Sequence, residues 1–281
     1  MTFTITSQVI LNNQVPMPWF GLGTFLSPTG EATQNAVRWA LEAGYRHIDT
    51  ARIYKNEEDV GAAIRQNGTP RSEIFITTKV WNDDQGYENT LRACEESLKR
   101  LATDYLDLYL VHWPAAGLRN QTYKALVQLR EQGKVRAIGV SNFMIRHLDE
   151  LLAETDITPA VNQIEVSPFI QRKELRAYCA AKGIVVEAYS TLSRGRRTED
   201  ERLAKIGQKY GKTAAQVALR WGLQSQMVII PKSVHRERII ENANIFDFEL
   251  SAEDMITLAG FDENYSVIPP AWNPETSPNW A

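Results

Sequence analysis

The sequence predicts an α/β fold, a (β/α)8 TIM barrel with an N-terminal β-hairpin cap and an irregular C-terminal tail. Eight short runs rich in Val, Ile and Leu alternate with segments in which apolar residues recur every third or fourth position. Near-continuous apolar strands are typical of a parallel sheet that helices cover on both faces. The length of 281 residues suits one barrel of about 250 residues, so we expect residues 1–281 to form a single domain.

The eight candidate strands are separated by segments long enough for the crossover helices that parallel strands need. In chain order they are residues 18–23, 46–50, 74–80, 106–113, 135–142, 160–166, 184–190 and 227–233. The segments between the strands carry patterns that predict helices. The helical pattern of residues 32–43 stops at Gly44, which suits a helix C-terminus, and Thr213 with Gln216 forms a capping box that begins another helix.

Two segments lie outside this alternation. Residues 1–16 are interpreted as a β-hairpin around Asn12 and Asn13 that covers the bottom of the barrel. Residues 261–281 contain four prolines, Trp272 and Trp280, and they show no helical period. Since exposed tryptophans are unfavourable in water, we expect this tail to fold over the barrel mouth; the alternative is a frayed terminus.

Composition excludes several classes of protein. Lys and Arg total 31 against 34 for Asp and Glu, so the net charge of -3 argues against a broadly basic nucleic-acid binder. No run of 18 apolar residues predicts a membrane span, and the polar start lacks a secretory signal. Cys94 and Cys179 make no disulfide framework, which favours the cytoplasm. The four histidines make no tight metal-ligand cluster, so we expect no metal.

Polar residues stand at the C-terminal end of nearly every candidate strand. In a barrel these ends form one rim, and the active sites of barrel enzymes lie on that rim. In order the rim residues are Thr24, Asp49, Lys79, His112, Ser141 with Asn142, Gln163, Tyr189 and Lys232.

Asp49, Lys79 and His112 would converge with Tyr54, which lies on the loop after Asp49. A lysine ammonium about 4 Å away stabilises a tyrosinate by about 4 kcal/mol at an effective dielectric constant of about 20. We therefore expect Lys79 to lower the pKa of Tyr54 by about two units. Such a set suits proton donation to a carbonyl oxygen. A reduction would also need a hydride from a cofactor, because these side chains cannot supply one. A purely structural interpretation, with a buried ion pair and a core histidine, stays open here.

The amino-acid sequences of several segments are similar to those of the aldo-keto reductase superfamily. The matches run in order from about residue 5 to about residue 260, and among relatives the chain looks most like the prokaryotic group that includes 2,5-diketo-D-gluconate reductases. The segments that carry the resemblance are GLGTF (21–25), GYRHIDTARIYKNEEDVG (44–61), FITTKVW (75–81), DLYLVHWP (107–114), IGVSNF (138–143), VNQIEVSPF (161–169) and IPKSVHRERIIENANIFDFEL (230–250).

The resemblance implies an NADPH-dependent reductase of aldehydes and ketones, 2,5-diketo-D-gluconate or other dicarbonyls among them. It also explains why no Rossmann fingerprint occurs. The catalytic tetrad falls on Asp49, Tyr54, Lys79 and His112, with Tyr54 as general acid and His112 orienting the carbonyl. A nucleotide-binding regulatory or structural protein with little catalysis is the alternative on the same fold.

Cofactor contacts carry over from the same resemblance. Lys232 and Arg238 lie near the start of a helix, which favours anions, so the 2′-phosphate of NADPH should be preferred over NADH. The short segment 193–200 carries Arg194, Arg196 and Arg197, which we hypothesise approach phosphates. Ser141, Asn142 and Gln163 match the positions that hydrogen-bond the carboxamide, and Tyr189 matches the aromatic residue that stacks on the nicotinamide ring. Thr24 and Asp49 match contacts near the nicotinamide ribose, and Ser190 and Leu192 match pyrophosphate contacts. The positions that match the adenosine end are Lys232, Ser233, Val234, Arg238, Glu241 and Asn242.

Aromatic residues supply the candidate walls of the substrate pocket, as suits compact carbonyl compounds with apolar parts. The expected partners are a small carbonyl substrate and neither nucleic acid nor membrane, and the resemblance favours a monomer. The substrate-binding candidates are Phe25, Tyr54, Trp81, His112, Trp113 and Trp272.

Overall fold

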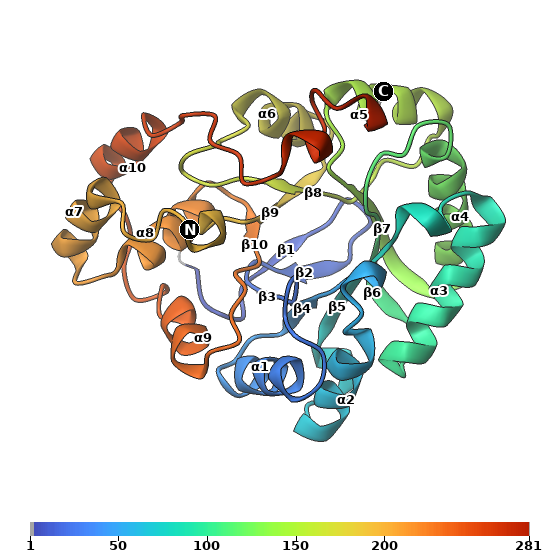
Figure 1. Cartoon of the computed structure of the whole chain (residues 1–281), viewed down its shortest axis with the longest axis horizontal. Helices are drawn as coiled ribbons and strands as arrows, with labels where there is room; N and C mark the ends of the chain where they lie inside the picture. The colour runs from blue at the N-terminus through green and yellow to red at the C-terminus, as the bar shows by residue number, and fades with distance from the viewer. Residues whose placement is uncertain (1–2, 281) are drawn as a thin grey trace.

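The computed structural model describes residues 3–280 and contains the predicted barrel of eight parallel strands. Each strand pairs with the next one in the chain, and a parallel bridge between Phe20 and Ile229 joins the last strand to the first. Figure 1 shows the strands at the centre of a ring of helices. The strands are β3 (Leu22–Gly23), β4 (His47–Asp49), β5 (Phe75–Val80), β6 (Leu106–Val111), β7 (Val135–Ser141), β8 (Val161–Glu165), β9 (Val185–Tyr189) and β10 (Val228–Ile229).

The helices bury apolar stripes against the outside of the strands, as Val37, Ala40 and Leu41 do in the first one. Their arrangement around the barrel can be followed in Figure 1. They are α1 (Glu31–Glu42), α2 (Glu57–Asn67), α3 (Tyr87–Leu101), α4 (Arg119–Glu131), α5 (Ile145–Glu154), α6 (Lys173–Ala181), α7 (Glu201–Tyr210), α8 (Ala214–Gln224), α9 (Arg236–Ala243) and α10 (Ala252–Ala259).

Two helix ends follow the predicted local chemistry. Gly44 takes a left-handed φ of 94° just after α1, and the N–H of Tyr45 donates to the carbonyl of Ala40 at 3.0 Å. Glycine adopts this conformation without the strain of a Cβ atom, so it ends the helix here. At α8, the N–H of Gln216 donates to Thr213 Oγ1, and Gln216 Oε1 accepts from the N–H of Thr213. The predicted capping box is therefore confirmed.

The N-terminal hairpin differs in its bounds from the predicted residues 1–16. Its strands are β1 (Gln8–Ile10) and β2 (Pro16–Pro18), so part of the predicted strand 18–23 belongs to the hairpin. Proline is tolerated in such a two-stranded ribbon because its missing N–H can face away from the partner. Asn12 Nδ2 donates to the carbonyl of Pro159 at 3.1 Å and Asn13 Nδ2 to that of Arg136 at 2.9 Å. These bonds hold the hairpin against the N-terminal end of the barrel.

Polar side chains occupy part of the barrel interior. His47 and Asp49 of β4, Thr77 of β5 and Glu187 of β9 are all buried. His47 Nε2 lies 3.0 Å from Thr77 Oγ1. Burying so many polar groups is unfavourable unless they find hydrogen-bond partners, and such clusters often mark a functional site. The candidate site is built on this layer.

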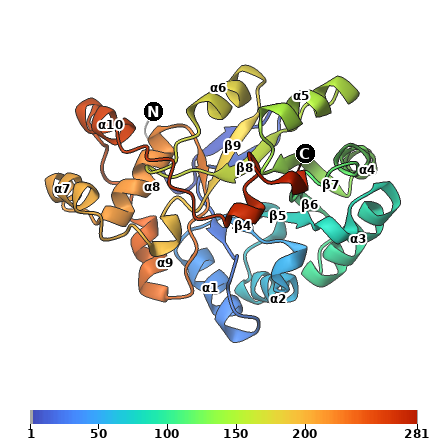
Figure 2. The ribbon, with the colours of Figure 1, turned by 45° about the horizontal axis from the view of Figure 1, so that its top comes forward.

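The C-terminal segment lies against the C-terminal ends of the barrel strands, where it meets Trp81 and Trp113. Trp280 is 4% exposed and stacks on Trp113 with ring centroids 5.1 Å apart. His147 Nε2 lies 2.7 Å from the Trp280 carbonyl, and Arg146 of α5 donates to the carbonyl of Pro274. In Figure 2 the red tail passes across the strand ends. None of the helices in residues 3–280 is long and apolar enough to cross a membrane.

Candidate active site

Lys79 is at the centre of the site, with its side chain 0% exposed. Its ammonium group donates to both carboxylate oxygens of Asp49 and to the carbonyl of Thr50, each at 2.8 Å. The same nitrogen lies 3.5 Å from the hydroxyl of Tyr54, which belongs to the short 3-10 helix η1 (Arg52–Tyr54) after β4. A charged, fully paired lysine is thus held beside a tyrosine hydroxyl.

The pKa of Tyr54 differs from the predicted direction. Burial raises the pKa of this phenol well above 10, and the negative charges of Asp49 and Glu187 add to the rise. Lys79 does not reverse this effect because Asp49 already balances its charge. The expected drop of two units is therefore wrong for this structure. Tyr54 keeps its proton at neutral pH, which is the state that a general acid requires.

His112 follows β6, and its ring lies between two aromatic neighbours. The ring centroids are 5.6 Å from Tyr54 and 5.2 Å from Trp81. Burial, together with the charge of Lys79, lowers the pKa of His112 well below 6.5. The imidazole is therefore neutral at pH 7, so it carries one N–H that could donate to a substrate oxygen.

Asn56 organises the loop that presents Tyr54, a role that the sequence analysis missed. Its side chain is fully buried; Oδ1 accepts from Thr50 Oγ1 at 2.8 Å, and Nδ2 donates to the carbonyl of Thr24 at 3.0 Å. Thr24 Oγ1 in turn donates to the carbonyl of Asp49 at 2.9 Å. An asparagine in a loop is an ordinary sequence feature, so no signal distinguished it before the fold brought these groups together.

The predicted carboxamide-binding residues and Tyr189, the predicted stacking residue, lie together at the ends of β7, β8 and β9. Asn142 Nδ2 donates to the carbonyl of His112 at 3.0 Å, and Tyr189 donates its hydroxyl to Asn142 Oδ1 at 2.6 Å. Ser141 Oγ donates to the carbonyl of Gln163 at 2.8 Å. Asn142 and Ser190 have φ values of 64° and 54°. Strained left-handed residues of this kind gather at binding sites.

Gln163 connects the tetrad to a second acid. Its Nε2 donates to Asp49 Oδ2 at 2.8 Å and to Glu187 Oε2 at 2.7 Å. Glu187 was not among the predicted site residues, because a Glu within an apolar strand gives no spacing signal. It faces the barrel interior beside His47, with 3.5 Å between His47 Nε2 and Glu187 Oε1.

The predicted adenosine-binding residues lie in one stretch that leads into α9. Lys232 and Arg238 are both exposed, and Lys232 Nζ donates to the carbonyl of Leu26 at 3.2 Å. No side chain caps the start of α9, so its first N–H groups are available to an anion. Ser233 Oγ accepts from the N–H of His235 at 3.0 Å. Glu241 Oε1 accepts from Thr213 Oγ1 at 2.8 Å. The remaining predicted members of this stretch are Val234, which is half-buried, and Asn242, which is buried.

The segment 193–200 folds into tight turns after Ser190 and Leu192, where the N–H of Ser193 donates to the Ser190 carbonyl at 2.6 Å. Arg197 pairs with Glu263 at 2.8 Å, so this arginine is engaged by the start of the tail. The guanidinium of Arg194 instead lies 5.3 Å from the ring centroid of Phe25, at the mouth. Of these two arginines, Arg194 is therefore nearer to the candidate site.

The aromatic candidates line the mouth around Tyr54. Phe25 lies 5.0 Å from Tyr54 between ring centroids. Trp272 of the tail stacks on Trp81 at 5.7 Å and meets Trp113 edge-on at 5.2 Å. The tail thus supplies part of the wall above the proposed proton donor.

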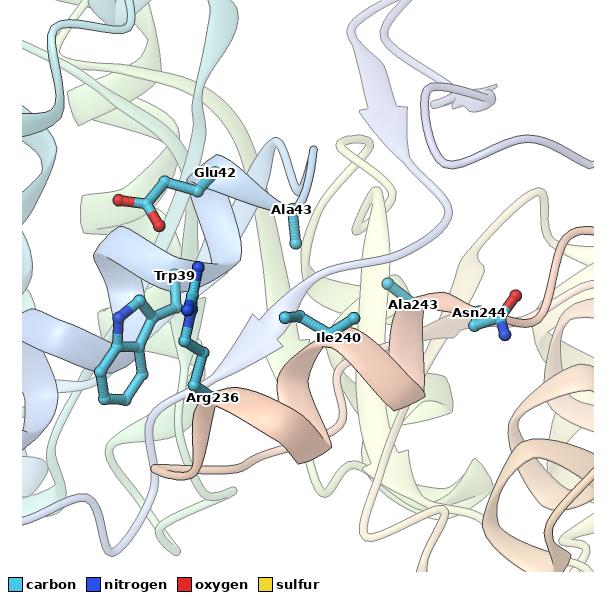
Figure 3. A pocket seen from close by; sticks show the side chains of 7 residues that line it. All are labelled: Trp39, Glu42, Ala43, Arg236, Ile240, Ala243 and Asn244. Carbon is cyan, nitrogen blue, oxygen red and sulfur yellow. The ribbon is translucent and has the colours of Figure 1, made fainter.

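A separate surface groove lies between α1 and α9 (Figure 3). It contains none of the candidate catalytic or cofactor-binding residues. Elsewhere, too, residues 3–280 contain no group of three or more His, Cys, Asp or Glu side chains that could hold a metal ion. The groove is lined by Trp39, Glu42, Ala43, Arg236, Ile240, Ala243 and Asn244.

Comparisons with known proteins agree with this geometry. The sequence profile of the Aldo/keto reductase family matches residues 20–263. The chain is 52% identical over 269 residues to glyoxal reductase of Bacillus subtilis (strain 168), covering 96% of this chain and 98% of that protein. It is 49% identical over 262 residues to 9,11-endoperoxide prostaglandin H2 reductase of Trypanosoma cruzi (strain CL Brener), covering 92% and 93%. The crystal structure of Bombyx mori aldo-keto reductase in complex with NADP matches with a TM-score of 0.90 at 37% identity, covering 98% of each chain.

Proposed function

The chain belongs to the aldo/keto reductase family, and from this premise we propose that it reduces aldehydes and ketones to alcohols with NADPH. It is an NAD(P)H-dependent oxidoreductase, and two similar aldo-keto reductase structures hold NADP or NADPH. The observation that carries the proposal is the Tyr54 hydroxyl, 3.5 Å from a buried lysine that Asp49 holds in place. The sequence-based alternative, a binding protein with little catalysis, gains no support from this arrangement.

The residues at the ends of β7 to β9 fit a nicotinamide. Both amide hydrogens of Gln163 go to carboxyl groups, which leaves Oε1 to accept from the N–H of a primary amide. Ser141, Asn142 and Gln163 would hold the carboxamide, and the ring of Tyr189 would stack on the nicotinamide. When bound, the cofactor supplies the hydride for the carbonyl carbon.

The chain's own residues handle the proton and the developing charge. Tyr54 donates its proton to the carbonyl oxygen as that oxygen becomes basic. Lys79 then stabilises the tyrosinate at short range, and Asp49 keeps the lysine positioned. The neutral His112 donates a hydrogen bond that orients the carbonyl.

The start of α9, the proposed site of the 2′-phosphate, supports a preference for NADPH over NADH. Lys232 and Arg238 add two positive charges to the uncapped start of α9, where the helix dipole also favours an anion. A 2′-phosphate makes strong charge-assisted hydrogen bonds with such groups. All six predicted adenosine contacts lie in the same stretch, residues 232–242.

For the substrate we propose a small dicarbonyl compound. The name of the Bacillus subtilis relative, glyoxal reductase, and the aromatic rings of Phe25, Trp81 and Trp272 around the site support this choice. 2,5-Diketo-D-gluconate belongs to the same chemical class. The two cysteines, both buried and unpaired, agree with action in the cytoplasm, and we further propose that the protein acts as a monomer.

The proposal is tested with a panel of glyoxal, methylglyoxal, 2,5-diketo-D-gluconate, aromatic aldehydes and simple ketones. The loss of NADPH absorbance is followed for each compound at matched concentrations. We expect the highest kcat/KM with a dicarbonyl. Turnover of none of these compounds at high enzyme concentration would contradict carbonyl reduction, whereas a preference for aromatic aldehydes would contradict the substrate class alone.

A further inference from the structure

We propose that Glu187 is a positioning residue that works as a neutral carboxylic acid, orienting Gln163 and leaving Asp49 as the sole carboxylate beside Lys79. The role in turnover depends on the proposed reductase function. The protonated state depends only on the contacts inside the barrel, so the two can be tested separately.

Glu187 is inside the barrel and touches the tetrad through one shared nitrogen. It lies on β9 opposite Gln163 of β8 in the strand register, and it is 0% exposed. Gln163 Nε2 donates to Glu187 Oε2 at 2.7 Å and to Asp49 Oδ2 at 2.8 Å. Two carboxyl groups from opposite sides of the barrel therefore meet at a single amide group.

The charges around this amide balance when one of its two carboxyl groups is neutral, and because Lys79 donates to both oxygens of Asp49, that group is Glu187. The titratable groups that face it are His47 and Asp49 of β4, Lys79 of β5, and Tyr54 above them. Burial and the charge of Lys79 lower the pKa of His47 to about 3, so this ring is uncharged. Lys79 is already paired with Asp49. An ionised Glu187 would leave one uncompensated negative charge away from water, which is strongly unfavourable.

The pKa of Glu187 agrees with this count. Burial and the neighbouring charge of Asp49 raise it to about 8, against the opposing effects of Gln163 and Lys79. Burial raises the pKa of Asp49 as well, but there the direct contact with Lys79 is the main opposing effect. Like charges that share a site disfavour ionisation of one partner. At neutral pH Glu187 is therefore mostly protonated.

The proton belongs on Oε1, because Oε2 accepts the hydrogen bond from Gln163. Among the described residues Oε1 has no hydrogen-bond partner, and Nε2 of the neutral His47 lies 3.5 Å away. The same nitrogen lies closer to Thr77 Oγ1, at 3.0 Å, and the ring carries no charge that could compensate a carboxylate. Among the described residues no cation contacts Oε1, so a proton on this oxygen removes a charge that would otherwise stay uncompensated.

The neutral acid has a consequence for Gln163. With one carboxyl oxygen on each amide hydrogen, the side-chain amide of Gln163 cannot rotate without losing both bonds, so the orientation of Gln163 Oε1 is fixed as well. Ionisation of Glu187 would add a negative charge near Tyr54, whose pKa this charge raises. A weaker acid donates its proton less readily, so reduction should decline as Glu187 ionises.

The protonation is tested without turnover. Glu187→Gln copies the neutral acid, with one acceptor and one donor group. Infrared spectra of the wild type near neutral pH should show the carbonyl band of a buried carboxylic acid that disappears at high pH and is missing from E187Q. Absence of this band from the wild type would overturn the proposal.

Thermal unfolding gives a second readout of the same proton. The folded-state pKa of about 8 lies above the reference value of 4.5, so ionisation of the unfolded chain destabilises the native state progressively as pH rises between these values. The Tm of E187Q relative to wild type should therefore increase from about pH 5 to about pH 8. A constant difference would contradict a neutral Glu187.

Glu57→Gln is the matched control, since Glu57 is equally buried but pairs with Arg100 outside the barrel interior. E57Q should not show the gain in relative Tm. A gain of the same size in E57Q would mean that the effect does not report on Glu187.

The positioning role is tested by the pH profile of kcat/KM. The wild type should lose activity on the alkaline side as Glu187 ionises, E187Q should lack that decline, and Glu187→Ala should raise KM for NADPH at pH 7 because Gln163 is released. Identical profiles in wild type and E187Q would refute the role in turnover. If no variant, wild type included, turns over carbonyls, the proposed reductase function fails while the infrared and Tm results still decide the protonation.

Discussion

At the scale of single residues, the hydroxyl of Tyr54 is the group on which the proposed chemistry depends. It lies 3.5 Å from Lys79 Nζ, and its ring packs 5.0 Å from Phe25 between centroids. Burial keeps it protonated, so its acidity becomes useful only when a carbonyl oxygen acquires charge next to it.

Tyr54→Phe removes this hydroxyl and keeps the ring. We expect kcat/KM to fall by roughly 100- to 10,000-fold, the usual contribution of a general acid, with NADPH binding unchanged. Steady-state rates and quenching of tryptophan fluorescence by NADPH measure the two effects. Tyr178→Phe on α6 serves as a control, because Tyr178 bonds to Asp149 far from the tetrad. Activity of Y54F near that of the wild type would disprove the assignment.

Lys79 and Asp49 depend on each other for stability. Lys79→Met leaves a buried carboxylate without its cation, so we expect a loss of about 3–5 kcal/mol in the free energy of unfolding. Urea unfolding of K79M and of the double variant K79M/D49N measures this loss. The double variant should regain stability over K79M, because it buries no unpaired charge. Equal stability of the two variants would show that the pairing does not matter.

At the scale of elements, α9 brings the proposed 2′-phosphate site together. Its start is uncapped by side chains, and Lys232 and Arg238 flank it. Arg236, the first residue of the same helix, lines the groove between α1 and α9 instead (Figure 3). The helix therefore presents two arginines to different surroundings.

Arg238→Ala should raise KM for NADPH by about tenfold or more and leave KM for NADH nearly constant, because a hydrogen bond to a charged group contributes about 1.5–3 kcal/mol. Arg236→Ala is the matched control on the same helix and should change neither value. Parallel Michaelis constants for the two cofactors check this expectation. Equal increases for NADPH and NADH would argue against contact with the 2′-phosphate.

Local signals predicted the elements with different success. Gly44 ends α1 and Thr213 begins α8 as expected, since caps depend on neighbouring residues alone. The strand predicted at 18–23 is instead split between β2 and β3. Its pairing depends on distant partners such as Ile229, which no local pattern reveals.

At the scale of the whole molecule, the C-terminal tail joins the barrel wall to the site. Trp272 and Trp280 pack on Trp81 and Trp113, while α5 holds the tail through Arg146 and His147. The tail thereby shapes the space above Tyr54 without belonging to the (β/α) repeat.

Trp272→Ala should alter kcat/KM for bulky aromatic aldehydes more than for glyoxal, because a small substrate needs less of this wall. Its cost in stability should stay below the about 3–5 kcal/mol of a fully buried tryptophan, since Trp272 is half-buried. Trp39→Ala, a half-buried tryptophan in the groove beside α1, is the control. Equal changes for all substrates in W272A would speak against a pocket wall.

The sequence by itself determined the alternation of strands and helices, and with it the barrel and the rim on which Asp49, Lys79 and His112 lie. Periodicity and strand ends suffice for this, because they are properties of neighbouring residues. The tertiary structure alone decided the charge state of Tyr54, the partners of Gln163 and the part played by Asn56 and Glu187. These depend on burial and on atoms that meet from strands far apart in the chain, which composition and spacing do not encode.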